Sequence, residues 1–207
     1  MPADGYQWDV FISYRRKSIV ERWLPNFLHL LEEWLTEELA ALGWTPLQPG
    51  APARIFTDSK IPAGANWQTA LREAVRTSRC AVTIWLPTYF QSAWCVAEWT
   101  SFRGRGNELV VPIRFHDGTS FPQEARVAQM FDFENYTSSA PAFRDTVKYV
   151  EFEGKVQEFA RRLAQVVMAA PPFPNLQLPP NWVSPQLDVL DLTDVLAPPP
   201  TIPLARW

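Results

Sequence analysis

The side chains best suited to chemistry in this sequence form two groups, a run of cations and a glutamate that follows a tryptophan. Arg15, Arg16 and Lys17 are consecutive, and the planar fork of arginine binds phosphate oxygens in a bidentate manner. Glu98 follows Trp94 by four residues, a spacing that places both on one face of a helix. Taken alone, the cations are typical of a solvated loop and Glu98 of a surface acid. The two groups indicate a site only if the fold brings them together.

The sequence lacks the motifs of phosphate-binding loops, metal sites and serine hydrolases. The eight glycines form neither a G-x-x-x-x-G-K-[ST] nor a G-x-G-x-x-G motif, which excludes Walker ATPases and ordinary dinucleotide-binding folds. The two histidines, His29 and His116, are far apart, and the two cysteines lack C-x-x-C spacing, so we expect no metal site and no resident cofactor. The G-x-S-x-G turn of serine hydrolases is also missing.

The elements that must position these residues follow an alternating pattern. Short β-rich runs alternate with amphipathic stretches, which predicts an α/β domain with a mostly parallel sheet, and the dense apolar content of the runs favours helices on both faces. The expected strands are Trp8–Tyr14, Arg54–Thr57, Cys80–Leu86, Glu108–Phe115 and Ala128–Phe133. The expected helices are Leu24–Leu42, Asn66–Thr77, Ala93–Phe102 and Phe152–Met168.

Local signals support two of these helices. In Leu24–Leu42 apolar residues recur every three or four positions; Pro25 is allowed in its first turn and Gly43 ends it. Ser92 is expected to be the N-cap of the helix that carries Glu98.

Ligands of parallel sheets bind beyond the carboxyl ends of the strands. The first strand ends in Ser13 and the cations, the second in Asp58-Ser59-Lys60, and the third in Pro87-Thr88-Tyr89-Phe90. We therefore expect these segments to meet at one edge, where the cations suit a phosphate-bearing ligand.

Composition limits the partners and the compartment. The 22 acids and 19 bases give a net charge of −3, which argues against nucleic acid. Two cysteines are too few for a secreted disulfide framework, the N-terminus has no export signal, and no apolar run is long enough to span a bilayer. A cytoplasmic protein without membrane segments is expected.

The C-terminal segment differs from the rest. Ten of the 20 prolines lie in residues 171–207, so this Pro-rich tail should be extended. It is also too apolar for a solvated linker. The sequence therefore predicts a domain over residues 1–170 and a tail over 171–207 that docks on its own domain or on a protein partner.

Four motifs follow one another along the chain: DVFISYRR (Asp9–Arg16), RIFTDSKIPAGANW (Arg54–Trp67), SRCAVTIWLPTYFQSAWCVAEW (Ser78–Trp99) and ELVVPIRF (Glu108–Phe115). Together they resemble the TIR (Toll/interleukin-1 receptor) domain family, over roughly residues 6–168. Extra residues with several prolines at Leu47–Ala53 depart from the family pattern. The resemblance implies a flavodoxin-like five-stranded parallel sheet with helices on both faces.

The resemblance also implies site residues. TIR domains are either enzymes that cleave NAD⁺ at its nicotinamide bond or scaffolds that self-associate, and Glu98 in a W-C-x-x-E run matches the catalytic position of the enzymes. The implied substrate-binding residues are Ser13, Arg15, Arg16, Asp58 and Trp94. The implied gating and assembly loop contains Lys60, Ile61, Pro62, Gly64 and Trp67.

Several roles stay open at this point. Arg15 or Arg16 would meet the pyrophosphate while the other pairs with a nearby acid. Asp58 would bond a ribose hydroxyl or cap the following loop. Trp94 would pack against the cleft or be an ordinary core residue.

The function implied by the resemblance is NAD⁺ cleavage, with NAD⁺ as substrate rather than cofactor, releasing nicotinamide and ADP-ribose or a cyclic ADP-ribose. Bacterial anti-phage defence is the implied setting, and further copies of the chain, in a homo-oligomer or filament, are the implied partners. The alternatives are a non-catalytic TIR–TIR interaction module and a nucleoside-transferase-like enzyme with a nucleophilic glutamate.

Overall fold

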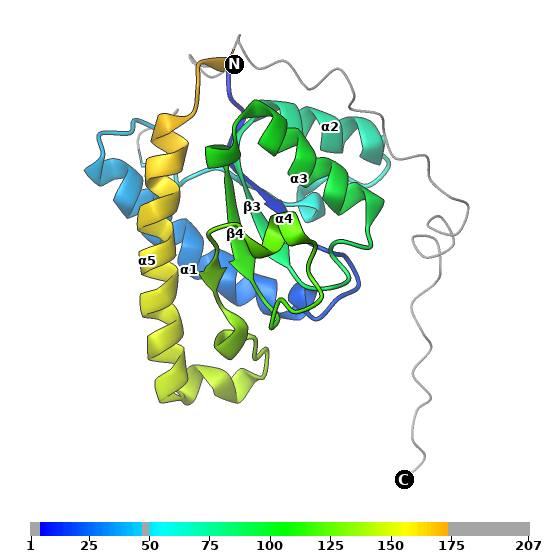
Figure 1. The fold of residues 1–207 in the computed structure, drawn as a ribbon. Helices are drawn as coiled ribbons and strands as arrows, with labels where there is room; N and C mark the ends of the chain where they lie inside the picture. Colours follow the sequence, from blue (N-terminus) through cyan, green and yellow to red (C-terminus); the bar gives the residue numbers. More distant parts are fainter. Residues whose placement is uncertain (1–4, 47–49, 174–207) are drawn as a thin grey trace.

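The sheet of this protein contains five parallel strands. The computed structural model describes residues 5–46 and 50–173, and in it the strand order is β2-β1-β3-β4-β5 (Figure 1). This is the flavodoxin-like order, as expected. The strands are β1 (Trp8–Ser13), β2 (Ile55–Phe56), β3 (Ser78–Trp85), β4 (Val110–Arg114) and β5 (Phe131–Asp132).

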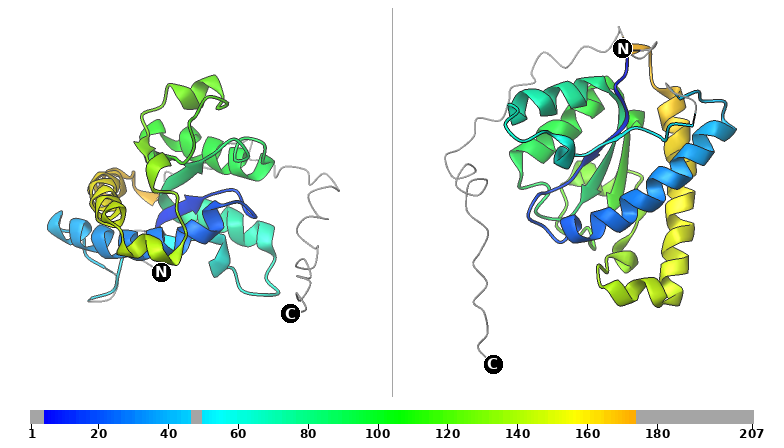
Figure 2. Two further views of the ribbon diagram at one scale, coloured as in Figure 1. Left: turned by 90° about the horizontal axis from the view of Figure 1, so that it is seen from below. Right: turned by 180° about the vertical axis from the view of Figure 1, so that it is seen from behind.

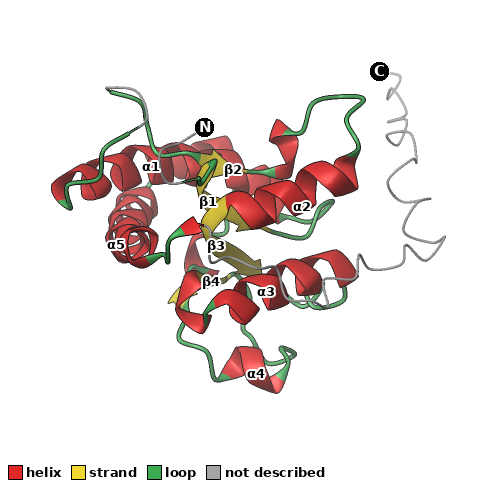
Figure 3. Cartoon of the chain, turned by 90° about the horizontal axis from the view of Figure 1, so that it is seen from above, coloured by secondary structure: helices red, strands yellow, loops and turns green. Residues whose placement is uncertain are grey.

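Helices cover both faces of the sheet, which confirms the expected layering. The strands lie between a pair formed by α1 and α5 and a pair formed by α2 and α3 (Figure 3), and α1 and α5 lie side by side (Figure 2). The helices are α1 (Val20–Ala41), α2 (Trp67–Thr77), α3 (Ala93–Arg105), α4 (Gln123–Arg126) and α5 (Val147–Ala169). Short 3₁₀ turns are η1 (Asp58–Lys60), η2 (Asn107–Leu109), η3 (Glu134–Tyr136) and η4 (Pro141–Asp145).

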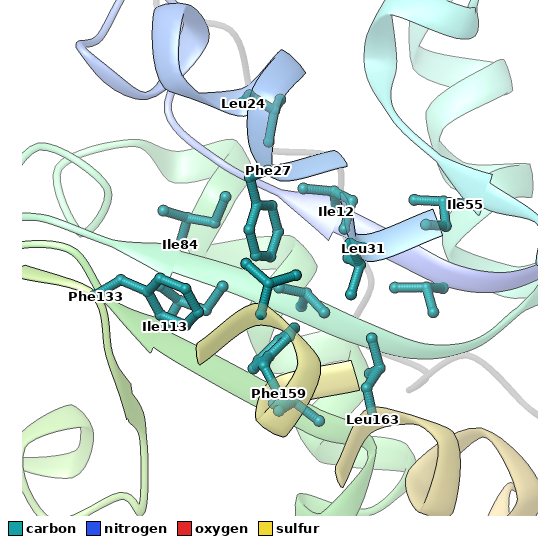
Figure 4. Close-up of a cluster of buried hydrophobic side chains, with 14 of the residues drawn as sticks. Ile12, Leu24, Phe27, Leu31, Ile55, Ile84, Ile113, Phe133, Phe159 and Leu163 are labelled. Atoms are coloured by element: carbon teal, nitrogen blue, oxygen red, sulfur yellow. The ribbon is translucent and has the colours of Figure 1, made fainter. Parts of the chain in front are cut away.

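The larger core lies between the sheet and the α1–α5 pair (Figure 4). Because successive side chains of a strand point to opposite faces, alternate residues of each strand enter this core. Full burial of each such aliphatic or aromatic side chain contributes about 1.5–3 kcal/mol. Its members include Ile12, Ile84, Ile113, Phe27, Leu31, Phe159 and Leu163.

A smaller core lies on the other face, under α2 and α3. Phe11 of β1 stacks on Phe56 with ring centroids 5.3 Å apart and contacts Phe102 of α3. Residues 9, 11 and 13 of β1 therefore share this face. The consequence for the site is that Ser13, the last residue of β1, points toward α3.

A buried carboxylate ties the start of β1 to its neighbours. Asp9 is fully buried. Arg54 binds it through Nε (3.0 Å to Oδ2) and Nη2 (2.7 Å to Oδ1), and the Arg54 backbone N–H donates to Oδ2 at 2.8 Å. Arg79 Nε lies 3.3 Å from Oδ1. Two guanidinium groups thus compensate the buried charge, and they connect β1 to the residues beside β2 and in β3.

The element bounds correct several expectations. β2 and β5 are two residues long, shorter than Arg54–Thr57 and Ala128–Phe133, because pairing extends over two positions only. Glu108 lies in η2 and not in β4. These short strands leave more of the sheet edge to loops.

The helices begin earlier or end later than expected. α1 starts at Val20, since the buried Val20 and Trp23 extend its apolar stripe, so Pro25 lies inside the helix and not in its first turn. α3 continues through Gly104 to Arg105, whose guanidinium donates to the carbonyls of residues 75 and 78. α5 begins at residue 147 and not at 152.

Only the start of the predicted tail is among the described residues. The Tyr6 hydroxyl donates to the Pro171 carbonyl at 2.6 Å, and the Phe173 ring packs edge-on against Tyr6 and under the guanidinium of Arg76. Residues 174–207 lie outside the described residues, so the domain boundary and the docking of the tail stay predictions. In the part of the chain that is described, no helix has both the length and the apolar character needed to cross a membrane.

We expect the Asp9→Ala substitution to lower the free energy of unfolding by about 3–5 kcal/mol, because it leaves two partly buried guanidinium groups without their carboxylate. Urea denaturation of the purified protein measures this change. The control is Glu73→Ala, which breaks the exposed pair with Arg76 and should cost less than about 1 kcal/mol. Equal losses in the two variants would contradict the role of Asp9.

Candidate active site

The carboxyl ends of β1 and β3 create a cleft. These strands are neighbours, and the order of the sheet reverses between them, with β2 on one side and β4 on the other; such switch points are where ligands bind in open α/β sheets. The cleft has a volume of about 560 Å³. It is lined by Arg15, Arg16, Lys17, Ser18, Ile19, Leu86, Pro87, Thr88, Gln91 and His116.

The cleft is cationic. Three basic side chains and one histidine line it, and none of the described residues in its wall is acidic. A larger cavity of about 610 Å³ lies away from this edge, beside the start of β4 and along α5, and its wall contains three arginines and three glutamates. The balanced charge there gives no preference for an anion, so the smaller cleft is the better candidate for a phosphate-bearing ligand.

Glu98 lies close to the cleft but does not line it. Its side chain belongs to α3 and is only 6% exposed. The Ser13 hydroxyl forms a 2.5 Å hydrogen bond with Glu98 Oε2, and the same Oγ lies 2.8 Å from the hydroxyl of Tyr89. The Tyr89 hydroxyl also donates to the backbone carbonyl of Cys95 at 3.0 Å. The structure therefore brings Ser13 and Glu98 together and adds Tyr89.

The helix that carries Glu98 begins as the sequence indicated. Ser92 is the N-cap of α3, and its Oγ accepts a hydrogen bond from the Cys95 N–H. Such a cap satisfies a backbone donor that has no partner within the helix. Glu98 then follows in the second turn, directly across from the end of β1.

The surroundings of Glu98 favour its neutral form. Burial is the largest cause and raises the pKa of this carboxyl to about 8, the hydrogen bond from Ser13 lowers it, and the negative charge of Asp58 raises it. The carboxyl is therefore mostly protonated at neutral pH. A strongly perturbed acid beside a cleft is typical of functional sites.

Asp58 joins the two loops at this edge. It accepts a hydrogen bond from the Tyr14 hydroxyl at 2.7 Å and pairs with Arg16 Nε at 3.1 Å. Arg16 is therefore the arginine with a local acid, whereas Arg15 and Lys17 form no ion pair with any of the described residues. Burial, with Asp58 as the next cause, raises the pKa of Tyr14, so its phenol stays neutral.

The expected gating loop is held at both ends and exposed in the middle. The Lys60 ammonium donates to the Ile55 carbonyl at 2.6 Å, and Ile61 packs on the smaller core. Pro62 and Gly64 are exposed, and Gly64 has a φ of +83° with open space around it, a conformation that favours glycine.

Trp67, at the end of this loop, contacts Trp94 edge-on, with ring centroids 4.9 Å apart. Trp94 is a member of the smaller core and does not line the cleft. It lies one helical turn before Glu98, so the contact links the loop to the helix that carries the acid.

Sequence reasoning did not identify Tyr89 or His116 as site residues. The available signal was position alone: Tyr89 follows β3 and His116 follows β4 at the ligand-binding edge. Within residues 5–46 and 50–173, no three His, Cys, Asp or Glu side chains are placed to hold a metal ion.

The sheet order and this edge define an α/β domain of flavodoxin-like topology in which one buried glutamate lies next to a cationic cleft. A model of the TIR domain family matches residues 10–147, well over half of the chain, and the chain belongs to that family. No curated protein matches it.

Two solved structures are similar in fold. One is the TIR domain of the Toll-related receptor TRR-2 from Hydra magnipapillata, at 15% identity and a TM-score of 0.44, covering 72% of this chain and 98% of the other. The second contains the TIR domains of the activated Roq1 resistosome that recognises the pathogen effector XopQ, at 21% identity and a TM-score of 0.38, covering 74% and 84%.

The raised pKa of Glu98 predicts a pH dependence of stability. Between about pH 4.5, the ordinary value, and about pH 8 the folded protein binds more protons at this site than the unfolded chain, so this contribution to stability falls as the pH rises. We expect the Glu98→Gln protein to match the wild type near the lower pH and to exceed its unfolding free energy above pH 8. Urea denaturation across this range measures both proteins, and parallel curves would contradict the assignment.

Proposed function

We propose that this protein cleaves NAD⁺ at the bond between nicotinamide and ribose, with Glu98 as the catalytic residue. The observation that carries the proposal is the buried carboxyl of Glu98. It is hydrogen-bonded to Ser13 and lies beside a cationic cleft at the switch point of the sheet. Its position in the W-C-x-x-E run is the one at which the resemblance to catalytic TIR domains implies an acid.

The chemistry explains why one carboxyl suffices. Ordinary glycosidases need a second carboxyl to protonate the leaving oxygen, whereas nicotinamide leaves from a pyridinium cation. The bond between ribose C1′ and the pyridinium nitrogen breaks, and its electron pair neutralises the leaving group. The ribose becomes an oxocarbenium ion, which a fixed carboxylate stabilises electrostatically. Attack by water gives ADP-ribose, and attack by an adenine nitrogen gives a cyclic product.

Glu98 must be ionised for this role, although its pKa is raised to about 8 in the free protein. A positive charge within about 4–6 Å favours the charged form of a carboxyl. The pyridinium ring of NAD⁺ carries such a charge and would lower the pKa of Glu98 on binding. Substrate binding would thus make Glu98 release its proton to solvent and produce the reactive carboxylate.

The cleft accounts for the other end of the substrate. Its volume of about 560 Å³ lies in the range of pockets for small ligands, about 300–1,000 Å³. Arg15 and Lys17 would bind the pyrophosphate, and His116 also lines the cleft. Because Glu98 does not line this cleft, the loop around Gly64 would have to move before nicotinamide reaches the acid.

Self-association fits the same loop. Its exposed middle, residues 62–65, would contact a second copy, and this contact would hold the loop in its open position. The buried free thiols of Cys80 and Cys95 fit a reducing, cytoplasmic compartment. The anti-phage role rests on the family resemblance alone.

A second candidate is a non-catalytic TIR–TIR interaction module. The observation that favours it is the burial of Glu98, which is 6% exposed and outside the cleft. In that case the carboxyl would only stabilise the packing of α3 on β1. Nicotinamide release by the pure protein distinguishes the two functions.

We expect Glu98→Gln to reduce nicotinamide release by at least about 10²–10³-fold, the usual effect of removing one preorganised electrostatic group. Gln retains the size and hydrogen-bonding reach of Glu but not its charge. The assay is chromatography of nicotinamide from pure protein and NAD⁺, with and without crowding agents. Glu108→Gln, in η2 and away from the cleft, is the control and should retain activity. A Glu98→Gln rate within about tenfold of the wild type would overturn the catalytic assignment.

We also expect the specific activity to rise with protein concentration, because a loop opened by a second copy makes the active species an oligomer. Measuring nicotinamide release over about a hundredfold range of concentration, beside the oligomeric state by light scattering, checks this. A constant specific activity throughout would show that a single chain forms the complete site.

A further inference from the structure

Two hydroxyl groups connect Glu98 to the backbone of its own helix. Glu98 Oε2 lies 2.5 Å from Ser13 Oγ, Ser13 Oγ lies 2.8 Å from the Tyr89 hydroxyl, and this hydroxyl lies 3.0 Å from the Cys95 carbonyl oxygen. The three side chains are 6%, 1% and 0% exposed. They form a linear chain of three hydrogen bonds inside the protein, which we call the Glu98–Cys95 chain.

The available protons determine which group donates in each hydrogen bond of the Glu98–Cys95 chain. A carbonyl oxygen only accepts hydrogen bonds, and each hydroxyl has one proton to donate. Tyr89 must therefore donate to Cys95, and Ser13 must donate to Tyr89. The remaining bond, between Ser13 and Glu98, then needs a proton from the carboxyl group. All three hydrogen bonds form together only when Glu98 is protonated.

Ionisation of Glu98 removes one bond from the chain. Ser13 must then donate to the carboxylate, so Tyr89 either turns to Ser13 and leaves Cys95, or keeps Cys95 and loses Ser13. A buried hydrogen bond that is lost without replacement destabilises the state that lacks it. Thr83, which pairs with Ser13 in register, has a buried hydroxyl without a hydrogen-bond partner among the described residues.

Building on the proposed function, we propose that Tyr89 is a positioning residue: through Ser13 it holds Glu98 in its protonated resting form, so that the carboxylate appears only beside a cationic substrate. The Glu98–Cys95 chain thus keeps the carboxyl group of Glu98 protonated between turnovers. The arrangement makes the reactive form depend on the pyridinium charge of NAD⁺.

The groups that face Glu98 agree with this role. Burial, the largest cause, and the charge of Asp58 from η1 both raise the pKa of Glu98, whereas the hydrogen bond that Ser13 of β1 donates to the ionised carboxylate lowers it. Burial also raises the pKa of Tyr89 and of the Cys95 thiol, so neither group adds a charge near neutral pH. Arg15 acts on the Cys95 thiol, where its positive charge lowers the pKa.

The hydroxyl groups of Tyr89 and Ser13 have opposite effects on the ionisation of Glu98. Tyr89→Phe removes two of three bonds from the protonated state and one of two from the ionised state, so it favours ionisation. Ser13→Ala removes the donor to the carboxylate, a charge-assisted bond that is stronger than its neutral counterpart, so it disfavours ionisation. Side chains that only fill space are not expected to shift the ionisation of Glu98 in opposite directions when each is replaced.

The test follows the protonation of Glu98 directly. Isotope-edited NMR of glutamate side-chain carboxyl carbons, with the Glu98 signal assigned by its loss in Glu98→Gln, gives the titration midpoint in each full-length protein. We expect the midpoint to fall by about 0.5–1 pH unit in Tyr89→Phe and to rise by a similar amount in Ser13→Ala. Ser13→Thr, which retains the hydroxyl, should restore the wild-type midpoint.

Tyr136→Phe is the matched control, because Tyr136 packs on the larger core outside the Glu98–Cys95 chain. The titration midpoint of Glu98 in this variant should equal that of the wild type. The pH profile of nicotinamide release should shift with the NMR midpoint in each variant. Equal midpoints in wild type and Tyr89→Phe, or shifts of one sign in Tyr89→Phe and Ser13→Ala, would overturn the positioning role. Midpoints that move as expected in proteins that release no nicotinamide would support it and reject the proposed function.

Discussion

The position of β1 between β2 and β3 is the constraint on which the site depends, and buried Asp9 fixes it. Two arginines, one before β2 and one in β3, bind this carboxylate, so β1 has one register against both neighbours. Side chains alternate along a strand, and a slip of one residue would exchange the two faces. With Asp9 fixed, Phe11 enters the smaller core and Ser13 faces Glu98.

Asp9 and Glu98 are buried carboxyls on the same face of the sheet, and their partners explain their different roles. Asp9 meets two guanidinium groups, so its charge is compensated and the pairing stabilises the fold. Glu98 meets hydroxyl groups and the field of another acid, so its charge has no cationic partner among the residues that the structure describes. A carboxyl that is buried without a cation is available to respond to a cationic substrate, and a salt-bridged one is not.

The sequence allowed prediction of the parallel sheet and its helical layers, because apolar periodicity and the alternation of β-rich runs with amphipathic stretches determine these. Ser13 and Glu98 were named as site residues from the family resemblance alone, and the hydrogen bond between them was not predicted. The limits of β2 and β5 were not predictable, since pairing with neighbouring strands determines them. The start of α1 was missed because Pro25 suggested a first turn, whereas the buried Val20 and Trp23 extend the helix. The proposed role of Tyr89 depends on a hydroxyl position that no spacing rule encodes.

The proposed function requires that assembly and substrate charge both affect Glu98, and both would act on the start of α3. Cys95, in its first turn, accepts the hydrogen bond that completes the Glu98–Cys95 chain, and Trp94 beside it contacts Trp67 at the end of the loop. Under the proposed function, a second copy that moves the loop would change the packing of Trp94, and ionisation of Glu98 would alter the bond at Cys95. Because adjacent residues of one helical turn move together, assembly and substrate charge would act on the same structural element.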